Sequence, residues 1–146
     1  MSDTLKVCGL TIERGTKLRT YLPVPDTNVK IPLTIINGDQ DGPTLLITAG
    51  IHGGEYPGIA AAMELGRDIE PEHVAGCLIM MHPVNIQGFW ARREMIVPED
   101  GKNLNRVFPG DPMGTLADKT AYLISNNFFS IADFYVDMHS GDIHES

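Results

Sequence analysis

The sequence predicts an α/β fold, with a mainly parallel sheet that has helices on both faces and is preceded by antiparallel strands. Short apolar runs at residues 44–48, 76–81 and 134–138 have the length and composition of buried parallel strands. Segments with helical periodicity lie between these runs, as crossover connections require. Upstream of them, β-prone stretches alternate with turn signals.

The amino-terminal portion, residues 1–40, is predicted to be rich in strands. Its β-prone stretches are separated by pairs of residues that favour turns, which is typical of antiparallel strands or hairpins. The stretches are Leu5–Ile12, Lys17–Leu22 and Val29–Ile36, and the turns fall at Arg14-Gly15, Pro25-Asp26 and Asn37-Gly38.

Two helices are expected in the remainder of the chain. The first spans Pro57 to about Ile69, and Pro57 suits the first helical turn, where a missing N–H has no cost. The second begins after Thr115, an N-cap residue with Asp118 three positions later, in a weaker form of the capping box. Its apolar residues recur at helical spacing at Ala117, Ala121, Ile124, Phe128 and Ile131.

Composition limits the class of protein. The chain has 146 residues, of which 42% are hydrophobic, so we expect a single domain over residues 1–146 with an α/β core at 41–146. The net charge of −8, without a basic block, argues against nucleic acid or an anionic membrane as a partner. The sequence contains neither an apolar run of membrane-spanning length nor a signal-peptide pattern, so a soluble cytoplasmic protein is expected.

Two clusters of polar residues follow predicted parallel strands, which end at the same edge of a sheet, where ligands gather. His52 and Glu55 form an H-x-x-E pair in a glycine-rich turn, and His139 follows residues 134–138. Two imidazoles and a carboxylate are a common ligand set for catalytic zinc. The H-x-x-E pattern alone also occurs by chance on surfaces, but its place after a strand favours a site for one Zn²⁺ per chain.

The segment at residues 83–114 is expected to form a long loop with candidate substrate-binding residues. Asn105 and Arg106 place an amide beside a guanidinium, whose planar fork suits a substrate carboxylate. Arg92 and Arg93 lie upstream, and one of them could polarise a scissile carbonyl and stabilise the oxyanion. For each of these arginines the alternative is a solvated charge or a surface ion pair.

Three motifs in this order resemble the succinylglutamate desuccinylase and aspartoacylase family of the zinc carboxypeptidase superfamily. They are His-Gly-Gly-Glu at 52–55, Asp-Gly-Lys-Asn-Leu-Asn-Arg-Val-Phe-Pro-Gly at 100–110 and Asp-Met-His-Ser-Gly-Asp at 137–142. The resemblance implies a zinc carboxypeptidase-like fold. It also implies zinc ligation by His52, Glu55 and His139, binding of a substrate carboxylate by Asn105 and Arg106, and carbonyl polarisation by Arg93 or Arg92.

The sequence departs from this family at two points. Family members often carry an aspartate that orients the first zinc histidine, where this chain has Asn103. An amide oxygen raises ligand basicity less than a carboxylate does, so lower zinc affinity is expected. The family's general-base glutamate lies well downstream of His139, and this chain ends seven residues after it. We therefore expect an incomplete carboxyl end without the general base, and Glu99 and Glu145 are the carboxylates that would test this expectation.

The predicted function is zinc-dependent hydrolysis of the amide bond of an N-acyl amino acid or a similar small substrate with a carboxylate. The alternatives are a metallocarboxypeptidase that acts on peptides, and a non-catalytic fragment that binds metal or carboxylate. The strand at 134–138 would expose an unpaired edge without further neighbours, which predicts self-association, most simply as a dimer. His73 is expected to be solvated, and His82 to be a hydrogen-bonded structural residue.

Overall fold

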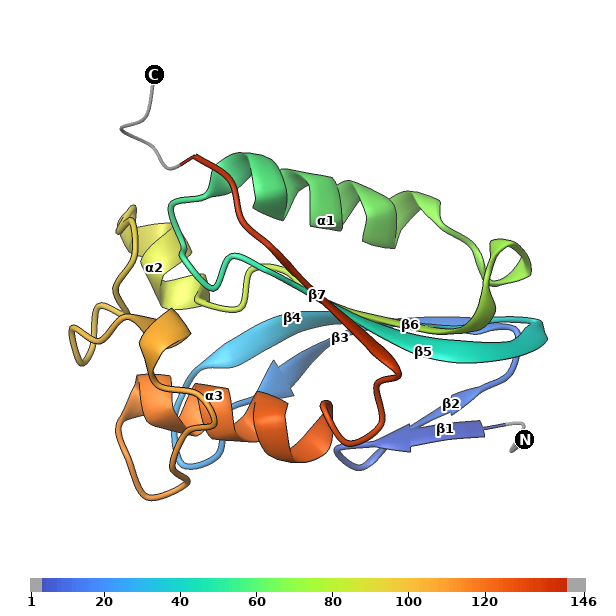
Figure 1. Cartoon of the computed structure of the whole chain (residues 1–146), viewed down its shortest axis with the longest axis horizontal. Helices are drawn as coiled ribbons and strands as arrows, with labels where there is room; N and C mark the ends of the chain where they lie inside the picture. Colours follow the sequence, from blue (N-terminus) through green and yellow to red (C-terminus); the bar gives the residue numbers. More distant parts are fainter. Residues whose placement is uncertain (1–3, 142–146) are drawn as a thin grey trace.

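The computed structural model of the chain describes residues 4–141. Its centre is a five-stranded sheet with the strand order β3-β4-β6-β5-β7, and a two-stranded hairpin, β1-β2, lies beneath it (Figure 1). The strands are β1 (Thr4–Val7), β2 (Leu10–Glu13), β3 (Thr16–Pro23), β4 (Lys30–Asn37), β5 (Gln40–Ala49), β6 (Ala75–Met81) and β7 (Phe134–Met138). The helices are α1 (Tyr56–Asp68), α2 (Ile86–Ala91) and α3 (Leu116–Asn127), with short 3-10 turns at Pro71–His73 and Leu104–Arg106.

The sheet is mixed, which corrects the predicted mainly parallel arrangement. β6, β5 and β7 are parallel to one another, whereas β4 is antiparallel to β6 and β3 is antiparallel to β4. Parallel neighbours need a crossover of about a dozen or more residues. Within residues 4–141, only the segments after β5 and after β6 are long enough, so the two earlier strands join the sheet in antiparallel orientation.

The prediction of antiparallel strands in the amino-terminal portion is confirmed, but the stretch Leu5–Ile12 forms two strands. Cys8 and Gly9 have φ angles of 49° and 76°, and Val7 pairs with Leu10 across them. Two consecutive residues with positive φ make the tight turn that suits the twist of a hairpin. Cysteine is uncommon at such a position, so this turn is not apparent from the sequence.

Both predicted helices are present. α1 has Pro57 in its first turn, and α3 begins after Thr115, whose backbone N–H and hydroxyl both donate to the Asp118 carboxylate. α3 ends at Asn127, before the predicted Ile131. None of the helices within residues 4–141 is long and apolar enough to cross a membrane.

The predicted long loop contains an additional helix, α2. The Asn85 side-chain oxygen accepts the Gly88 N–H at 2.9 Å and caps the helix, which is only 6 residues long and too short for a periodic apolar pattern. α2 packs closely on the turn after β5, because a Cβ at Gly53 would lie 2.4 Å from the Phe89 backbone nitrogen. Only glycine allows two backbones to approach this closely.

Both faces of the sheet are covered, as predicted. α1 lies over one face, where an apolar cluster contains Ile36, Ile47, Leu78 and Met80 (Figure 1). α3 and the β1-β2 hairpin lie on the other face and form the larger core with residues such as Ile35, Leu46 and Ile79. Adjacent residues such as Ile35 and Ile36 belong to opposite clusters, because side chains alternate between the faces of a strand.

His82 and His73 have the environments expected from the sequence. His82 is buried, and its Nε2 lies 3.1 Å from Oγ1 of Thr34. Burial lowers the pKa of His82, so this imidazole is neutral near pH 7. His73 is exposed beside Glu72.

β7 is an edge strand, contrary to the buried position predicted for residues 134–138. It pairs with β5 on one side, and no other strand within residues 4–141 pairs with it. The exposed fractions of Phe134, Tyr135 and Val136 are 62%, 42% and 45%. This strand therefore combines unpaired backbone groups with exposed apolar side chains, which favours association with another strand.

We propose that the 146-residue chain self-associates through β7. Light scattering across a dilution series should show an average mass that rises with concentration toward that of a dimer. Val136→Lys should weaken this association, because a charged side chain on an edge strand opposes pairing. Tyr21→Lys on β3, at the other edge of the sheet, is the matched control, and a wild-type monomer at every concentration would contradict the proposal.

The contact between α2 and the turn after β5 leads to a second prediction. Gly53→Ala should destabilise the fold by roughly 1–3 kcal/mol, because the added Cβ forces two backbones apart. Chemical denaturation measures this change. Gly58→Ala is the control, since a Cβ there has its nearest neighbour at 3.5 Å and alanine favours a helix. Equal losses of stability in both variants would show that the close contact is not the cause.

Candidate metal centre

The predicted metal-binding residues lie at the carboxyl ends of β5 and β7. β5 lies between β6 and β7. The crossover that leaves β5 contains α1 on one face of the sheet, and the crossover that leaves β6 contains α3 on the other face (Figure 1). Such a switch point leaves a crevice beyond the strand ends, where α/β proteins bind ligands. The turn after β5 carries His52 and Glu55, and His139 directly follows β7.

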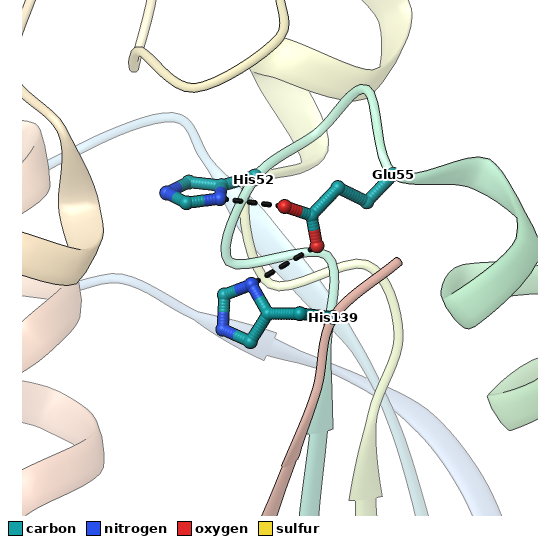
Figure 2. A group of neighbouring side chains, drawn as sticks. All are labelled: His52, Glu55 and His139. Atoms are coloured by element: carbon teal, nitrogen blue, oxygen red, sulfur yellow. Dashed lines mark hydrogen bonds and ion pairs between the residues drawn. The ribbon is translucent and has the colours of Figure 1, made fainter. Parts of the chain in front are cut away.

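His52, Glu55 and His139 converge on one point (Figure 2). One potential ligand atom from each residue lies within 4.8 Å of the other two. Nδ1 of His52 is 2.8 Å from Oε1 of Glu55, and Nδ1 of His139 is 3.0 Å from Oε2 of the same carboxylate. His52 and Glu55 are buried, whereas about a third of the His139 side chain is exposed, at 34%. The three side chains could therefore hold one metal ion that is open to solvent on the His139 side.

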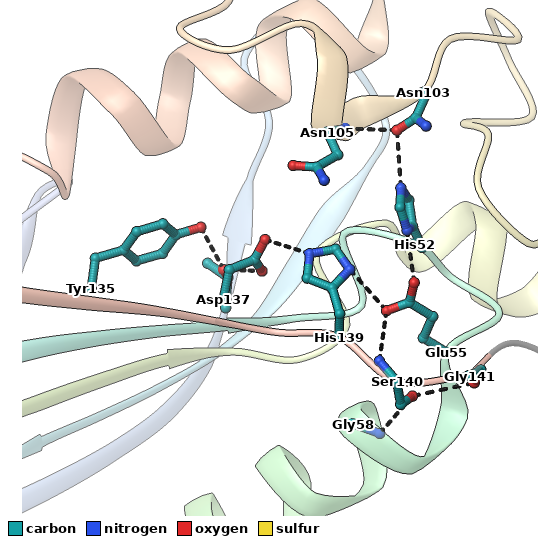
Figure 3. A network of polar contacts seen from close by, with 11 residues as sticks. His52, Glu55, Gly58, Asn103, Asn105, Tyr135, Asp137, His139, Ser140 and Gly141 are labelled. Atoms are coloured by element: carbon teal, nitrogen blue, oxygen red, sulfur yellow. Dashed lines mark hydrogen bonds and ion pairs between the residues drawn. The ribbon is translucent and has the colours of Figure 1, made fainter.

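Each histidine contacts a second side chain through Nε2 (Figure 3). Nε2 of His52 is 3.0 Å from Oδ1 of Asn103, and Nε2 of His139 is 2.7 Å from Oδ2 of Asp137. Oδ1 of Asn103 also accepts the backbone N–H of Asn105 at 2.9 Å, which identifies this atom as the oxygen. Both rings therefore donate through Nε2, and both Nδ1 atoms face the same carboxylate.

This arrangement requires a positive charge between the two imidazoles and Glu55, because nitrogen lone pairs and carboxylate oxygens repel each other at such distances. Burial alone would raise the pKa of Glu55, but contacts with His52, the Ser140 N–H and His139 bring it below its usual value. Burial alone would lower the pKa of His139, but Asp137 and Glu55 raise it. Two imidazole nitrogens and an ionised carboxylate fit a divalent metal as well as they fit a proton.

The predicted pair Asn105 and Arg106 lies on the turn that also carries Asn103. Figure 3 shows Asn103 and Asn105 of this turn. Arg106 is exposed, and its guanidinium donates to the Asn105 carbonyl oxygen at 3.1 Å. No carboxylate within residues 4–141 forms an ion pair with Arg106. The turn thus brings the amides of Asn103 and Asn105 beside the metal centre and carries the exposed Arg106 as the next residue.

Arg92 and Arg93 follow α2 and are exposed. Arg92 has a φ of 52° and lines an open cleft of about 490 Å³ with Tyr56, Phe89 and Trp90. Of the residues that line this cleft, Tyr56 directly follows Glu55 in the sequence. In the described part of the chain no hydrogen bond or ion pair joins either arginine to the three central side chains.

Three residues outside the predicted ligand set support the centre: Asp137, Ser140 and Thr48. Two of them, Asp137 and Ser140, lie in the motif at 137–142. The Ser140 N–H donates to Oε2 of Glu55 at 3.1 Å, and Thr48 donates to Oδ1 of Asp137 at 2.7 Å. Asp137 is the charged residue of an otherwise uncharged strand and precedes His139 by two positions, which puts both on one face. That spacing is the signal that could have identified Asp137.

The structure does not connect the candidate general bases with this centre. Glu99 is exposed on the loop after α2, and among the described residues it has no contact with the three central side chains. Glu145 lies outside the described residues.

Proteins of known function and structure are similar to this chain. N-alpha-acetyl-L-2,4-diaminobutyric acid deacetylase from Halomonas elongata is 40% identical over 128 residues, covering 83% of this chain and 37% of that protein. Among solved structures, a succinylglutamate desuccinylase/aspartoacylase from Rhodobacter sphaeroides has 34% identity and a TM-score of 0.81. The product-bound ectoine utilization protein EutE (DoeB) from Ruegeria pomeroyi has 34% identity and a TM-score of 0.83. Each structural match covers 97% of this chain and 44% of the other.

The chain thus spans less than half the length of these relatives. Residues 41–145 match the succinylglutamate desuccinylase/aspartoacylase catalytic domain, and this range includes the turn after β5, the loop with Asn105 and the end of β7. The expected resemblance is therefore confirmed, and the chain belongs to the succinylglutamate desuccinylase/aspartoacylase family.

Proposed function

We propose that this chain forms the zinc-binding part of a deacylase that hydrolyses the amide bond of an N-acyl amino acid or a similar small substrate with a carboxylate. The observation that carries the proposal is the convergence of two imidazole Nδ1 atoms and one carboxylate at the switch point of the sheet. This donor set is typical of catalytic zinc, which keeps a fourth position for water or substrate. His52, Glu55 and His139 would hold the ion.

The names of the relatives support an N-acyl amino acid as the substrate class. The Halomonas elongata relative is an N-acetyl-diaminobutyric acid deacetylase, and the Ruegeria pomeroyi relative acts in ectoine utilization. These relatives favour a deacylase over a carboxypeptidase. Because the chain covers 37% and 44% of their lengths, the activity of a whole protein is part of the proposal.

The residues around the centre have distinct proposed roles. A bound zinc ion would lower the pKa of its water and polarise the substrate carbonyl. Asn105 and Arg106 would bind the substrate carboxylate, and Arg92 or Arg93 would stabilise the oxyanion. Within residues 4–141, the carboxylates that contact the centre are those of Glu55 and Asp137, and both are engaged by histidines. We therefore assign the general base to a residue outside this range.

Product analysis tests the reaction class. The zinc-loaded chain is incubated separately with N-acetyl-L-2,4-diaminobutyric acid and with a short peptide, and released acetate and amino acids are quantified. A deacylase releases acetate from the first compound, whereas a carboxypeptidase releases the terminal residue of the second. Because the general base is assigned to a residue outside residues 4–141, the same assay is run with a longer chain that extends to the length of the relatives. Binding without turnover by both chains supports the non-catalytic alternative.

The metal assignment makes a direct prediction. The purified chain should bind about one Zn²⁺ per protomer, and His52→Ala should lose most of this binding, because two ligands hold an ion far more weakly than three. Elemental analysis after dialysis, together with titration against a chelator, measures both. His73→Ala removes an exposed histidine away from the centre and is the control.

A change at Asn103 tests the same assignment in the opposite direction. Asn103→Asp should tighten zinc binding, because a carboxylate raises the basicity of the His52 imidazole more than an amide does. Equal zinc content in wild type, His52→Ala and Asn103→Asp would contradict the proposed site.

The carboxylate assignment predicts an effect of Arg106 on ligand binding. Arg106→Ala should weaken binding of an N-acetyl amino acid by about 1.5–3 kcal/mol, the usual range for a hydrogen bond to a charged group. The neutral amide of the same ligand should bind wild type and variant alike. Calorimetry measures these affinities, and Arg67→Ala, an exposed arginine on α1 that pairs with Asp68, is the control. If wild type and Arg106→Ala discriminate equally between acid and amide, Arg106 does not bind the carboxylate.

A further inference from the structure

A row of hydrogen-bonded side chains lies behind His139. Tyr135, Asp137 and His139 alternate along β7 and its end, so they share one face of the strand. Thr48 on β5 is the register partner of Asp137. Oγ1 of Thr48 lies 2.8 Å from the Tyr135 hydroxyl and 2.7 Å from Oδ1 of Asp137, while Oδ2 of Asp137 lies 2.7 Å from Nε2 of His139.

The direction of each hydrogen bond in this row is determined by Asp137. An ionised carboxylate only accepts hydrogen bonds, so both Thr48 and His139 must donate to it. Thr48 has a single hydroxyl hydrogen, which is then committed to Asp137, and its oxygen must accept from Tyr135. The row therefore begins at the phenol O–H of Tyr135. At its other end Asp137 accepts a hydrogen bond from His139, which favours the His139 tautomer with the proton on Nε2.

Tyr135, the donor at the start of the row, contacts both Thr48 and a neighbouring aromatic ring. Thr48 is fully buried, and the Tyr135 ring lies against Phe129 with 4.9 Å between ring centroids. Phe129 stacks in turn with Phe108, two residues after Arg106. Burial raises the pKa of Tyr135, which keeps its hydroxyl protonated and able to donate.

The two histidines of the centre are supported in different ways. The partner of His52 is Asn103, whose oxygen is held by a backbone N–H and needs no other side chain. The partner of His139 is Asp137, whose second oxygen is held by a side chain from a neighbouring strand. His139 is also the more exposed ligand, so its orientation depends more on this row than that of His52 depends on Asn103.

We propose that Thr48 and Tyr135 are positioning residues that act through Asp137 to keep the His139 proton on Nε2 and to direct Nδ1 toward a bound metal ion. The metal-ion part of this inference rests on the proposed function. The part that concerns the tautomer of His139 is a property of the chain alone.

Three variants interrupt the row at successive positions: Tyr135→Phe, Thr48→Val and Asp137→Asn. Asp137→Asn should weaken Zn²⁺ binding by about 10–100-fold, the usual effect of losing the outer partner of a ligating histidine. Thr48→Val should weaken it less, by at least about threefold, and Tyr135→Phe least of all, because Thr48 still donates to Asp137 in that variant. Chelator competition with Zn²⁺ measures the three affinities.

The second readout is nitrogen NMR of the imidazoles in the metal-free chain, recorded over a pH series that extends to where the His139 signals no longer change with pH. His139 in the wild type should carry its proton mainly on Nε2. Thr48→Val and Asp137→Asn should increase the fraction with the proton on Nδ1, where Glu55 is the competing acceptor. This measurement does not require zinc, so it tests the row even if the chain binds no metal.

Thr34→Val is the matched control, because Thr34 is also a buried threonine of the same sheet with a side-chain hydrogen bond to a histidine. It should alter the signal of His82 and leave both the His139 tautomer and zinc affinity unchanged. Thermal unfolding of each variant verifies that the fold is retained. If Thr48→Val and Thr34→Val have the same zinc affinity and the same His139 tautomer, the proposed positioning role is wrong.

Discussion

Parallel pairing joins β5 and β7 from Leu45 with Phe134 to Ala49 with Met138, and this ladder determines where the two parts of the metal centre meet. His52 and Glu55 follow one strand and His139 follows the other, so the register fixes their separation. A shift of one residue would turn His139 and Asp137 to the opposite face of β7. The site therefore depends on a pairing between segments that are distant in the sequence.

The register of β5 and β7 also determines which charged and polar groups meet at the centre. Two Nδ1 atoms face one carboxylate, and their Nε2 atoms are bound by Asn103 and Asp137. The outer contacts orient both rings, so the inner atoms are left for a cation. A neutral amide supports one histidine and a carboxylate supports the other, and a carboxylate raises the basicity of a ligating imidazole more than an amide does.

The elements around the centre differ in how firmly the fold holds them. The turn with His52 is enclosed by α2 at Gly53, and the Ser140 N–H fixes the Glu55 carboxylate. The arginines, by contrast, are exposed on connecting segments, and β7 itself lies at the edge of the sheet. His52 and Glu55 are thus positioned by backbone packing. His139 follows an edge strand, and the proposed substrate contacts are surface side chains on loops.

The sequence by itself determined most of the elements and the candidate ligands. Apolar runs, helical periodicity and turn residues are local signals, so they located α1, α3 and the strand segments, but neither the turn between β1 and β2 nor the short helix α2. The H-x-x-E pair together with a histidine after a strand identified His52, Glu55 and His139. Only the tertiary structure decided the antiparallel orientation of β3 and β4, the edge position of β7, and the contacts of Thr48 and Tyr135 with Asp137. These features depend on which strands become neighbours and in what register, and pairing between distant segments leaves no mark in the local pattern of residues.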